Sequence, residues 1–165
     1  MKKFELTSET KINIFGKKLF RIKALVSFGV VKTGETGGWV EKEENVNQSG
    51  DAWVFGNAEV FGNARVSGDA EVFGNARVSG NARVFGNAEV FGNADYTTIH
   101  GFGTQFRTTT FFRCKDKQVK VSCGCFYGTI PEFREQVKNT RDGKIAEEYL
   151  MIADLMEKHF AEEAK

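Results

Sequence analysis

The sequence has few of the residues that mark secreted scaffolds or membrane segments. Only three cysteines occur among 165 residues, and their odd number and irregular spacing favour reduced thiols over a disulfide framework. No run of about 18 apolar residues is present to span a bilayer, and the start MKKFELTSETK lacks the apolar core of a signal peptide. We therefore expect a soluble, cytoplasmic protein with no membrane partner.

Net charge is nearly absent as well, because 23 Lys and Arg residues face 22 Asp and Glu residues. A chain with a net charge of +1 has no general attraction for nucleic acid or anionic membranes, so strong non-specific DNA binding is disfavoured. The charges balance only over the whole chain, however, and not within its segments. Residues 1–49 hold nine basic and six acidic groups (+3), residues 50–97 three and six (−3), and residues 98–165 eleven and ten (+1).

The acidic middle segment repeats every six residues. Its glycines lie at Gly50, Gly56, Gly62, Gly68, Gly74, Gly80, Gly86 and Gly92. In each unit, such as GNAEVF, the alternation after the glycine predicts a short strand with Ala and Val on one face. Gly followed by Asn or Asp predicts a corner, because both tolerate positive φ. A helix is excluded, since glycine at every sixth position would cost roughly 1 kcal/mol each.

Such units can wind continuously, three to a coil. They resemble the hexapeptide repeat of left-handed parallel β-helices, in which an aliphatic residue and a small residue four positions later point inward. Val54 with Ala58 fits this pattern, which continues through Val90 with Ala94. The resemblance implies a mainly β fold in which residues 50–97 form a short left-handed parallel β-helix.

The flanks have the character of caps for the two ends of that β-helix. Residues 1–49 are expected to form an N-terminal β element, with a hairpin from Lys11 to Leu25 that turns at Gly16-Lys17-Lys18. Residues 98–165 are expected to form a C-terminal α+β cap that begins with strands at Arg107 to Arg113 and Gln118 to Cys125.

Two helices complete the predicted cap. Thr129 and Glu132 have capping-box spacing with Pro131 between them, which predicts a short helix that buries Phe133 and Val137. A final helix from about Lys144 would carry one apolar stripe. The stripe consists of Ile145, Tyr149, Ile152, Met156 and Phe160.

The flanks also resemble a family of phage and prophage hexapeptide-repeat proteins. The matching stretches are Leu19 to Leu25 (LFRIKAL), Gly37 to Asn47 (GGWVEKEENVN), Gly103 to Phe112 (GTQFRTTTFF) and Cys123 to Phe133 (CGCFYGTIPEF). Family members are often labelled hypothetical or polymer-forming cytoskeletal. The resemblance implies a phage or prophage setting, and hence the cytoplasm of a host cell, more clearly than it implies an activity.

Residues eighteen apart should stack in columns on the outer faces of the coils. One face would carry Phe55, Phe73 and Phe91 beside Trp53. An apolar stripe this large is expected to be covered. We consider three covers, in this order of preference: the flanks of the same chain, a second copy, and a ligand or partner protein.

A second column would carry Glu59, Arg77 and Asp95, whose alternating charges could pair across the ~4.8 Å coil spacing. Phe61 belongs to the same face.

A third column would carry Arg65 and Arg83 with Phe85, followed along the chain by Arg107 and Arg113. Arginines near aromatic rings can hold bases and phosphates. Stacked arginines beside an acidic face are nevertheless more often a solvated surface. Nucleic acid or nucleotide is therefore a disfavoured partner.

The sequence predicts no catalytic residue, metal site or cofactor. Many left-handed β-helices are acyltransferases with a histidine base, but His100 and His159 both lie outside the repeats. Cys123 and Cys125 would share one strand face as small buried hydrophobes. A zinc site from Cys114, Cys123, Cys125 and His100 is the alternative, although a Cys-x-Cys pair lacks the usual spacing.

We thus expect a non-enzymatic structural or interaction module of phage or prophage origin that self-associates as a homo-oligomer. A phage counter-defence binder that sequesters a host protein or nucleotide is the second hypothesis. A hexapeptide-repeat acyltransferase is the third.

Overall fold

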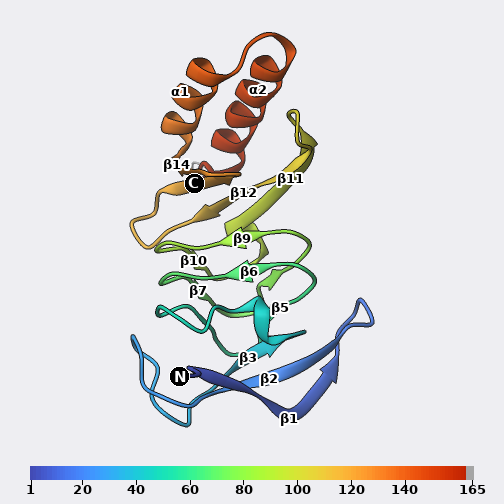
Figure 1. Cartoon of the computed structure of the whole chain (residues 1–165), viewed down its shortest axis with the longest axis vertical. Helices are drawn as coiled ribbons and strands as arrows, with labels where there is room; N and C mark the ends of the chain where they lie inside the picture. The colour runs from blue at the N-terminus through green and yellow to red at the C-terminus, as the bar shows by residue number, and fades with distance from the viewer. Residues whose placement is uncertain (163–165) are drawn as a thin grey trace.

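The computed structural model describes residues 1–162 and is mainly β, with helices at its C-terminal end. The elements lie above one another in chain order, from an N-terminal hairpin through many short strands to a sheet that carries two helices (Figure 1). The prediction of a mainly β chain with C-terminal helices is therefore confirmed. None of the helices between residues 1 and 162 is long and apolar enough to cross a membrane.

Each repeat unit but the last contributes a two-residue strand. These are β4 (Trp53–Val54), β5 (Glu59–Val60), β6 (Arg65–Val66), β7 (Glu71–Val72), β8 (Arg77–Val78), β9 (Arg83–Val84) and β10 (Glu89–Val90). They pair in parallel at intervals of eighteen residues: β4 with β7, β7 with β10, β5 with β8, and β6 with β9. The predicted stacking of residues eighteen apart is confirmed.

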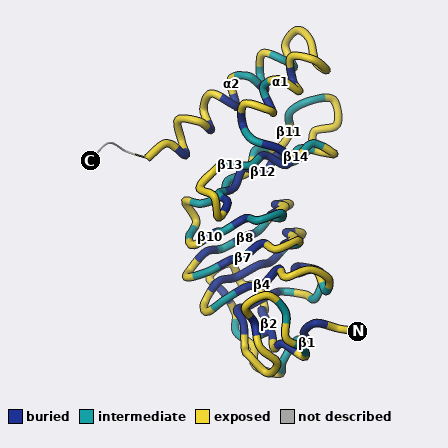
Figure 2. Tube along the Cα trace, turned by 90° about the vertical axis from the view of Figure 1, so that its left-hand side faces the viewer, coloured by how far each residue is buried: buried dark blue, intermediate teal, exposed yellow. Residues whose placement is uncertain are grey.

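The corners have the backbone that their glycines predict. All the repeat glycines from Gly50 to Gly86 have φ between 57° and 74°. Stacked corners also approach closely, since a Cβ at Gly68 would lie 2.9 Å from the Gly86 backbone nitrogen. The Ala and Val positions of the repeats from Ala52 to Val90 are buried while most corner residues are exposed, as Figure 2 shows.

The eighth unit, GNADYT, departs from the prediction. Gly92 is extended, the next residues form the 3₁₀ helix η2 (Asn93–Asp95), and Ala94 is exposed instead of inward. The Asp95 carboxylate accepts two backbone N–H hydrogen bonds from its own turn, at 2.9 and 3.0 Å. This local turn directs the chain into β11 (Tyr96–Phe102), which runs antiparallel to the next strand.

The N-terminal element contains β1 (Phe4–Ile12), β2 (Lys18–Ala24), β3 (Thr36–Val40) and the 3₁₀ helix η1 (Glu43–Asn45). β1, β2 and β3 pair antiparallel, which confirms the hairpin. β3 then pairs in parallel with β5, so that Val40 faces Val60, and Val46 forms a parallel bridge with Val66. Parallel pairing therefore starts before the first repeat glycine, at an interval of twenty residues. Val46 and Val54 are eight positions apart, whereas later valines are six apart, so the two extra residues lie between them.

The C-terminal sheet has the order β11-β12-β13-β14 and is antiparallel. Its other members are β12 (Arg107–Arg113), β13 (Val119–Cys123) and β14 (Phe126–Thr129), and two helices follow, α1 (Ile130–Thr140) and α2 (Gly143–Phe160). The capping box is confirmed, because Thr129 Oγ1 accepts from the Glu132 backbone N–H at 3.3 Å and the Glu132 carboxylate accepts from the Thr129 N–H at 2.7 Å. The strands β11 and β14 were not predicted.

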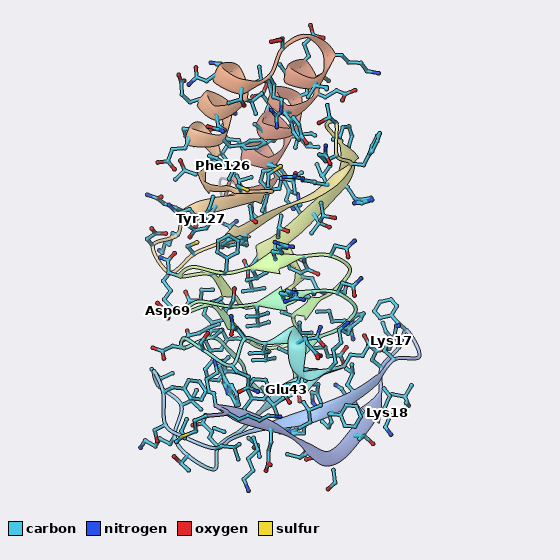
Figure 3. The ribbon with its side chains drawn as sticks, viewed as in Figure 1. Lys17, Lys18, Glu43, Asp69, Phe126 and Tyr127 are labelled. Carbon is cyan, nitrogen blue, oxygen red and sulfur yellow. The ribbon has the colours of Figure 1, made fainter. Side chains whose placement is uncertain are left out.

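This sheet separates the helices from the repeats. Phe126 and Tyr127 are neighbours on β14 and point to opposite sides, as Figure 3 shows. The Phe126 ring lies 5.5 Å from that of Phe133 on α1, whereas the Tyr127 ring lies 4.6 Å from that of Phe85 on the repeats. One face of the sheet therefore holds the helices and the other covers the end of the repeat region.

Candidate functional site

Trp53 was predicted on an outer surface, and this prediction is wrong. Its side chain is completely buried, with its ring 5.9 Å from Phe4 and 5.3 Å from Phe28. Both neighbours belong to the N-terminal element. That element therefore covers Trp53, which is the first residue of the column that continues with Glu71 and Glu89. The indole nitrogen of Trp53 has no hydrogen-bond partner among the described residues, so the residue contributes apolar packing alone.

Phe55, Phe73 and Phe91 form a stacked column, here called the phenylalanine ladder. The ring centroids of Phe55 and Phe73 are 4.5 Å apart with an interplanar angle of 6°, and those of Phe73 and Phe91 are 4.8 Å apart at 17°. Parallel pairing at eighteen-residue intervals places the rings in register. Phe91 is 57% exposed and the other two rings are half-buried, so the ladder presents an aromatic surface to solvent.

The other outward phenylalanines are covered by the flanks. Phe61 is buried against Phe15, at 5.7 Å between ring centroids, and against Leu19 of the N-terminal hairpin. Phe85 lies beneath Tyr127 of the C-terminal sheet. The flanks therefore cover two columns and leave the ladder exposed.

The charged column forms one of its two predicted pairs. The Glu59 carboxylate is buried and lies 3.6 Å from Arg77 Nε and 2.8 Å from Lys11 Nζ. Asp95 instead pairs with Arg113, at 3.3 Å.

Arg113 therefore does not belong to the predicted arginine surface. Besides its contact with Asp95, it donates a hydrogen bond to the Phe160 carbonyl at 2.8 Å, and its guanidinium lies 5.4 Å from the Phe160 ring centre. These contacts join β12 to the end of α2, which is a structural role.

The remaining arginines line a concave surface between the repeats and the C-terminal sheet. This basic groove has a volume of about 650 Å³, and its charged or ionisable lining includes Lys42, Arg65, Arg83, His100 and Arg107 together with one carboxylate, Glu44. A second hollow of about 460 Å³ adjoins it and shares Arg65 and Arg83. The structure thus brings together three of the predicted arginines and adds a lysine from the N-terminal element.

Local contacts position the arginines. Arg65 and Arg83 face each other in register on β6 and β9. The Arg83 backbone N–H donates to Thr110 Oγ1 at 3.1 Å, so β12 occupies the place that a further repeat would take. Arg107 packs over Gly124, where a Cβ would collide with its guanidinium.

None of these three arginines forms a salt bridge with any residue from 1 to 162. Their charges are therefore available to an anion. Arg65 and Arg83 were predicted together from their eighteen-residue spacing, and Arg107 from its place on the strand that follows the repeats. Lys42 was not predicted, because it reaches the groove only through the fold of the N-terminal element.

The cysteines lie in three different environments. Cys114 is buried, and burial raises the pKa of its thiol to about 11. Cys123 is half-buried, whereas Cys125 lies in the turn after β13 and is exposed at the groove, so the predicted shared strand face is wrong. Within the described part of the chain, no three His, Cys, Asp or Glu side chains are close enough together to hold a metal ion.

His100 also lies at the groove, where its Nδ1 is 2.9 Å from Thr108 Oγ1. This contact orients the imidazole on β11.

Comparison with protein-family models and with curated proteins finds no match for the chain. The resemblance to phage hexapeptide-repeat proteins therefore stays a prediction.

Proposed function

We propose that this protein is a non-enzymatic structural and interaction module that binds a second copy of itself through the phenylalanine ladder. The observation that carries the proposal is the in-register stack of three aromatic rings on an outer face, with Phe91 57% exposed. Exposed aromatic surface of this kind is usually covered by a partner. The flanks of the chain cover Phe61 and Phe85 instead.

The proposed architecture explains why the ladder is suited to assembly. Parallel pairing at eighteen-residue intervals and the positive-φ corners support a left-handed parallel β-helix of hexapeptide repeats, closed by the N-terminal β element and the C-terminal α+β cap. In such a coil the backbone holds each outward ring at a fixed spacing. A face ordered before binding loses little conformational entropy on association.

Charge favours a second copy as the occupant. The repeat region carries −3 and the N-terminal element +3, so two copies offer each other complementary surfaces. Glu89 lies beside the ladder on β10 and adds negative charge there. The ladder of one copy would therefore meet a different patch of the other copy, in a heterologous contact.

Light scattering coupled to size exclusion tests this proposal. We expect the wild type to have a mass above the 18.4 kDa of one chain and Phe91→Lys to be monomeric, because a charged ammonium replaces the most exposed ring. Met151→Lys is the matched control, since Met151 is a 70% exposed apolar residue of α2, far from the ladder in the chain. A monomeric wild type, or an unchanged mass for Phe91→Lys, would contradict the proposal.

The phage or prophage setting belongs to this proposal and rests on the resemblance of the flanks.

A further inference from the structure

We propose that the basic groove binds a nucleotide, with its phosphates between Arg65, Arg83 and Arg107 and its base against Phe106. This site goes beyond the proposed self-association, because it lies on another face of the repeats and shares no residue with the ladder.

Charge is the first support. Like charges directly opposite on neighbouring strands are destabilising, yet Arg65 and Arg83 occupy paired positions and have no carboxylate partner among the described residues. Lys42 adds a further cation, whose Nζ contacts the neutral Asn63 at 3.4 Å. An anion placed among these groups would convert repulsion into attraction.

Phosphate matches this arrangement better than a single carboxylate does. Each guanidinium presents N–H donors in a planar fork that pairs with phosphate oxygens. Arg65, Arg83 and Arg107 come from different strands or strand ends and line one hollow, so a ligand with several anionic oxygens can contact all three.

The dimensions of the groove favour a small ligand. Its volume of about 650 Å³ lies within the range of about 300–1,000 Å³ that is usual for small-molecule sites. The repeat strands form one wall and the C-terminal sheet forms the other. Gly124, beneath Arg107, leaves the space that its guanidinium needs.

Phe106 supplies an aromatic surface for the base. It lines the groove next to Arg107 and is 66% exposed. Its φ of 48° is uncommon for a bulky residue, and such conformations cluster at ligand sites. Bases stack on exposed aromatic rings in many nucleotide sites.

Calorimetric titration with a panel of ATP, GMP and cyclic AMP tests the assignment. We expect saturable binding of at least one nucleotide, one per chain, that weakens as salt increases. Arg83→Gln should raise its Kd at least about tenfold, because a charge-assisted hydrogen bond is lost. Arg141→Gln is the matched control, since that exposed arginine lies at the end of α1 and its guanidinium donates, among the described residues, only to the Thr140 carbonyl.

A second variant separates the base from the phosphates. Phe106→Asn removes the ring but retains a residue that tolerates positive φ. It should weaken binding of the nucleotide and leave inorganic pyrophosphate unaffected. Bound nucleotide should also slow alkylation of Cys125, which is exposed in the groove, and leave Cys114 unchanged.

Three results would overturn the assignment. The first is no saturable binding of any nucleotide in the panel, and the second is equal affinity in Arg83→Gln and the wild type. The third is tighter binding of an oligothymidylate or a polyglutamate peptide than of every nucleotide, which would assign the groove to a single strand or an acidic peptide. None of these results bears on the proposed self-association through the ladder, because that proposal is tested by the molecular mass of the protein in solution.

Discussion

Lys3 is a buried cation at the boundary between the N-terminal strand and the first repeats. Its ammonium donates hydrogen bonds to the Ala52 carbonyl at 2.8 Å and the Gly50 carbonyl at 3.1 Å, and it lies 4.6 Å from the Phe28 ring centre. Burial lowers the pKa of Lys3 to about 8, although the nearby Asp51 carboxylate opposes this shift. The residue therefore makes the stability of the protein depend on pH.

The direction of this dependence follows from proton linkage. Between about pH 8 and the ordinary lysine pKa of 10.5, the unfolded chain holds a proton on Lys3 that the folded chain has lost. Stability due to Lys3 should therefore rise with pH across this window. We expect Lys3→Met to lack that rise when urea unfolding is measured at several pH values.

Cys114 supplies an opposing contribution, so the test compares the two proteins at each pH. Its thiol pKa is raised from 9.0 to about 11, and the folded chain thus retains a proton that the unfolded chain loses, which lowers stability as pH rises through this range. The difference between wild type and Lys3→Met removes this contribution. A difference that stays constant with pH would contradict the prediction for Lys3.

Cys125 and Cys114 should also differ in reactivity. The thiolate is the reactive form, so the exposed Cys125 should be alkylated by iodoacetamide before the buried Cys114, whose pKa is about 11. Peptide mass spectrometry during a time course measures both rates. The urea-unfolded chain is the control, in which the rates should converge. Equal rates in the native protein would show that Cys114 is not protected.

The repeat corners offer a matched pair of substitutions. Gly56 and Gly68 have φ of 57° and 66°, but a Cβ at Gly56 would have no neighbour within 4 Å, whereas one at Gly68 would lie 2.9 Å from the Gly86 nitrogen. Gly56→Ala should therefore cost only the backbone strain, about 1–2 kcal/mol. Gly68→Ala should cost more, because the stacked corner must also move. Equal losses in the free energy of urea unfolding would mean that corner stacking contributes little.

Elements with local signals were predicted correctly. The α1 helix follows its capping box, and α2 buries Tyr149, Ile152, Met156 and Phe160 of the predicted stripe. The end of the repeats was predicted wrongly, because Ala94 fits the repeat pattern in sequence while the Asp95 carboxylate binds backbone amides of its own turn. The parallel pairing of β3 was missed because two extra residues between Val46 and Val54 lengthen its interval to twenty residues.

Across the whole molecule, the flanks determine which repeat columns remain available. The N-terminal element covers Trp53 and Phe61, and the C-terminal sheet covers Phe85. The phenylalanine ladder and the basic groove remain, on different columns of the same repeats. One repeat region therefore presents two chemically different surfaces.

The period of six, the glycine corners, the inward Ala and Val positions and the start of α1 all follow from short stretches of sequence. They depend on backbone preferences and on side-chain alternation between neighbours in the chain. Exposure of Phe91, burial of Trp53 and the charges left free at Arg65 and Arg83 depend on which distant segment docks on each column. Repeat units with nearly identical sequences acquire different environments for that reason, and only the tertiary structure assigns them.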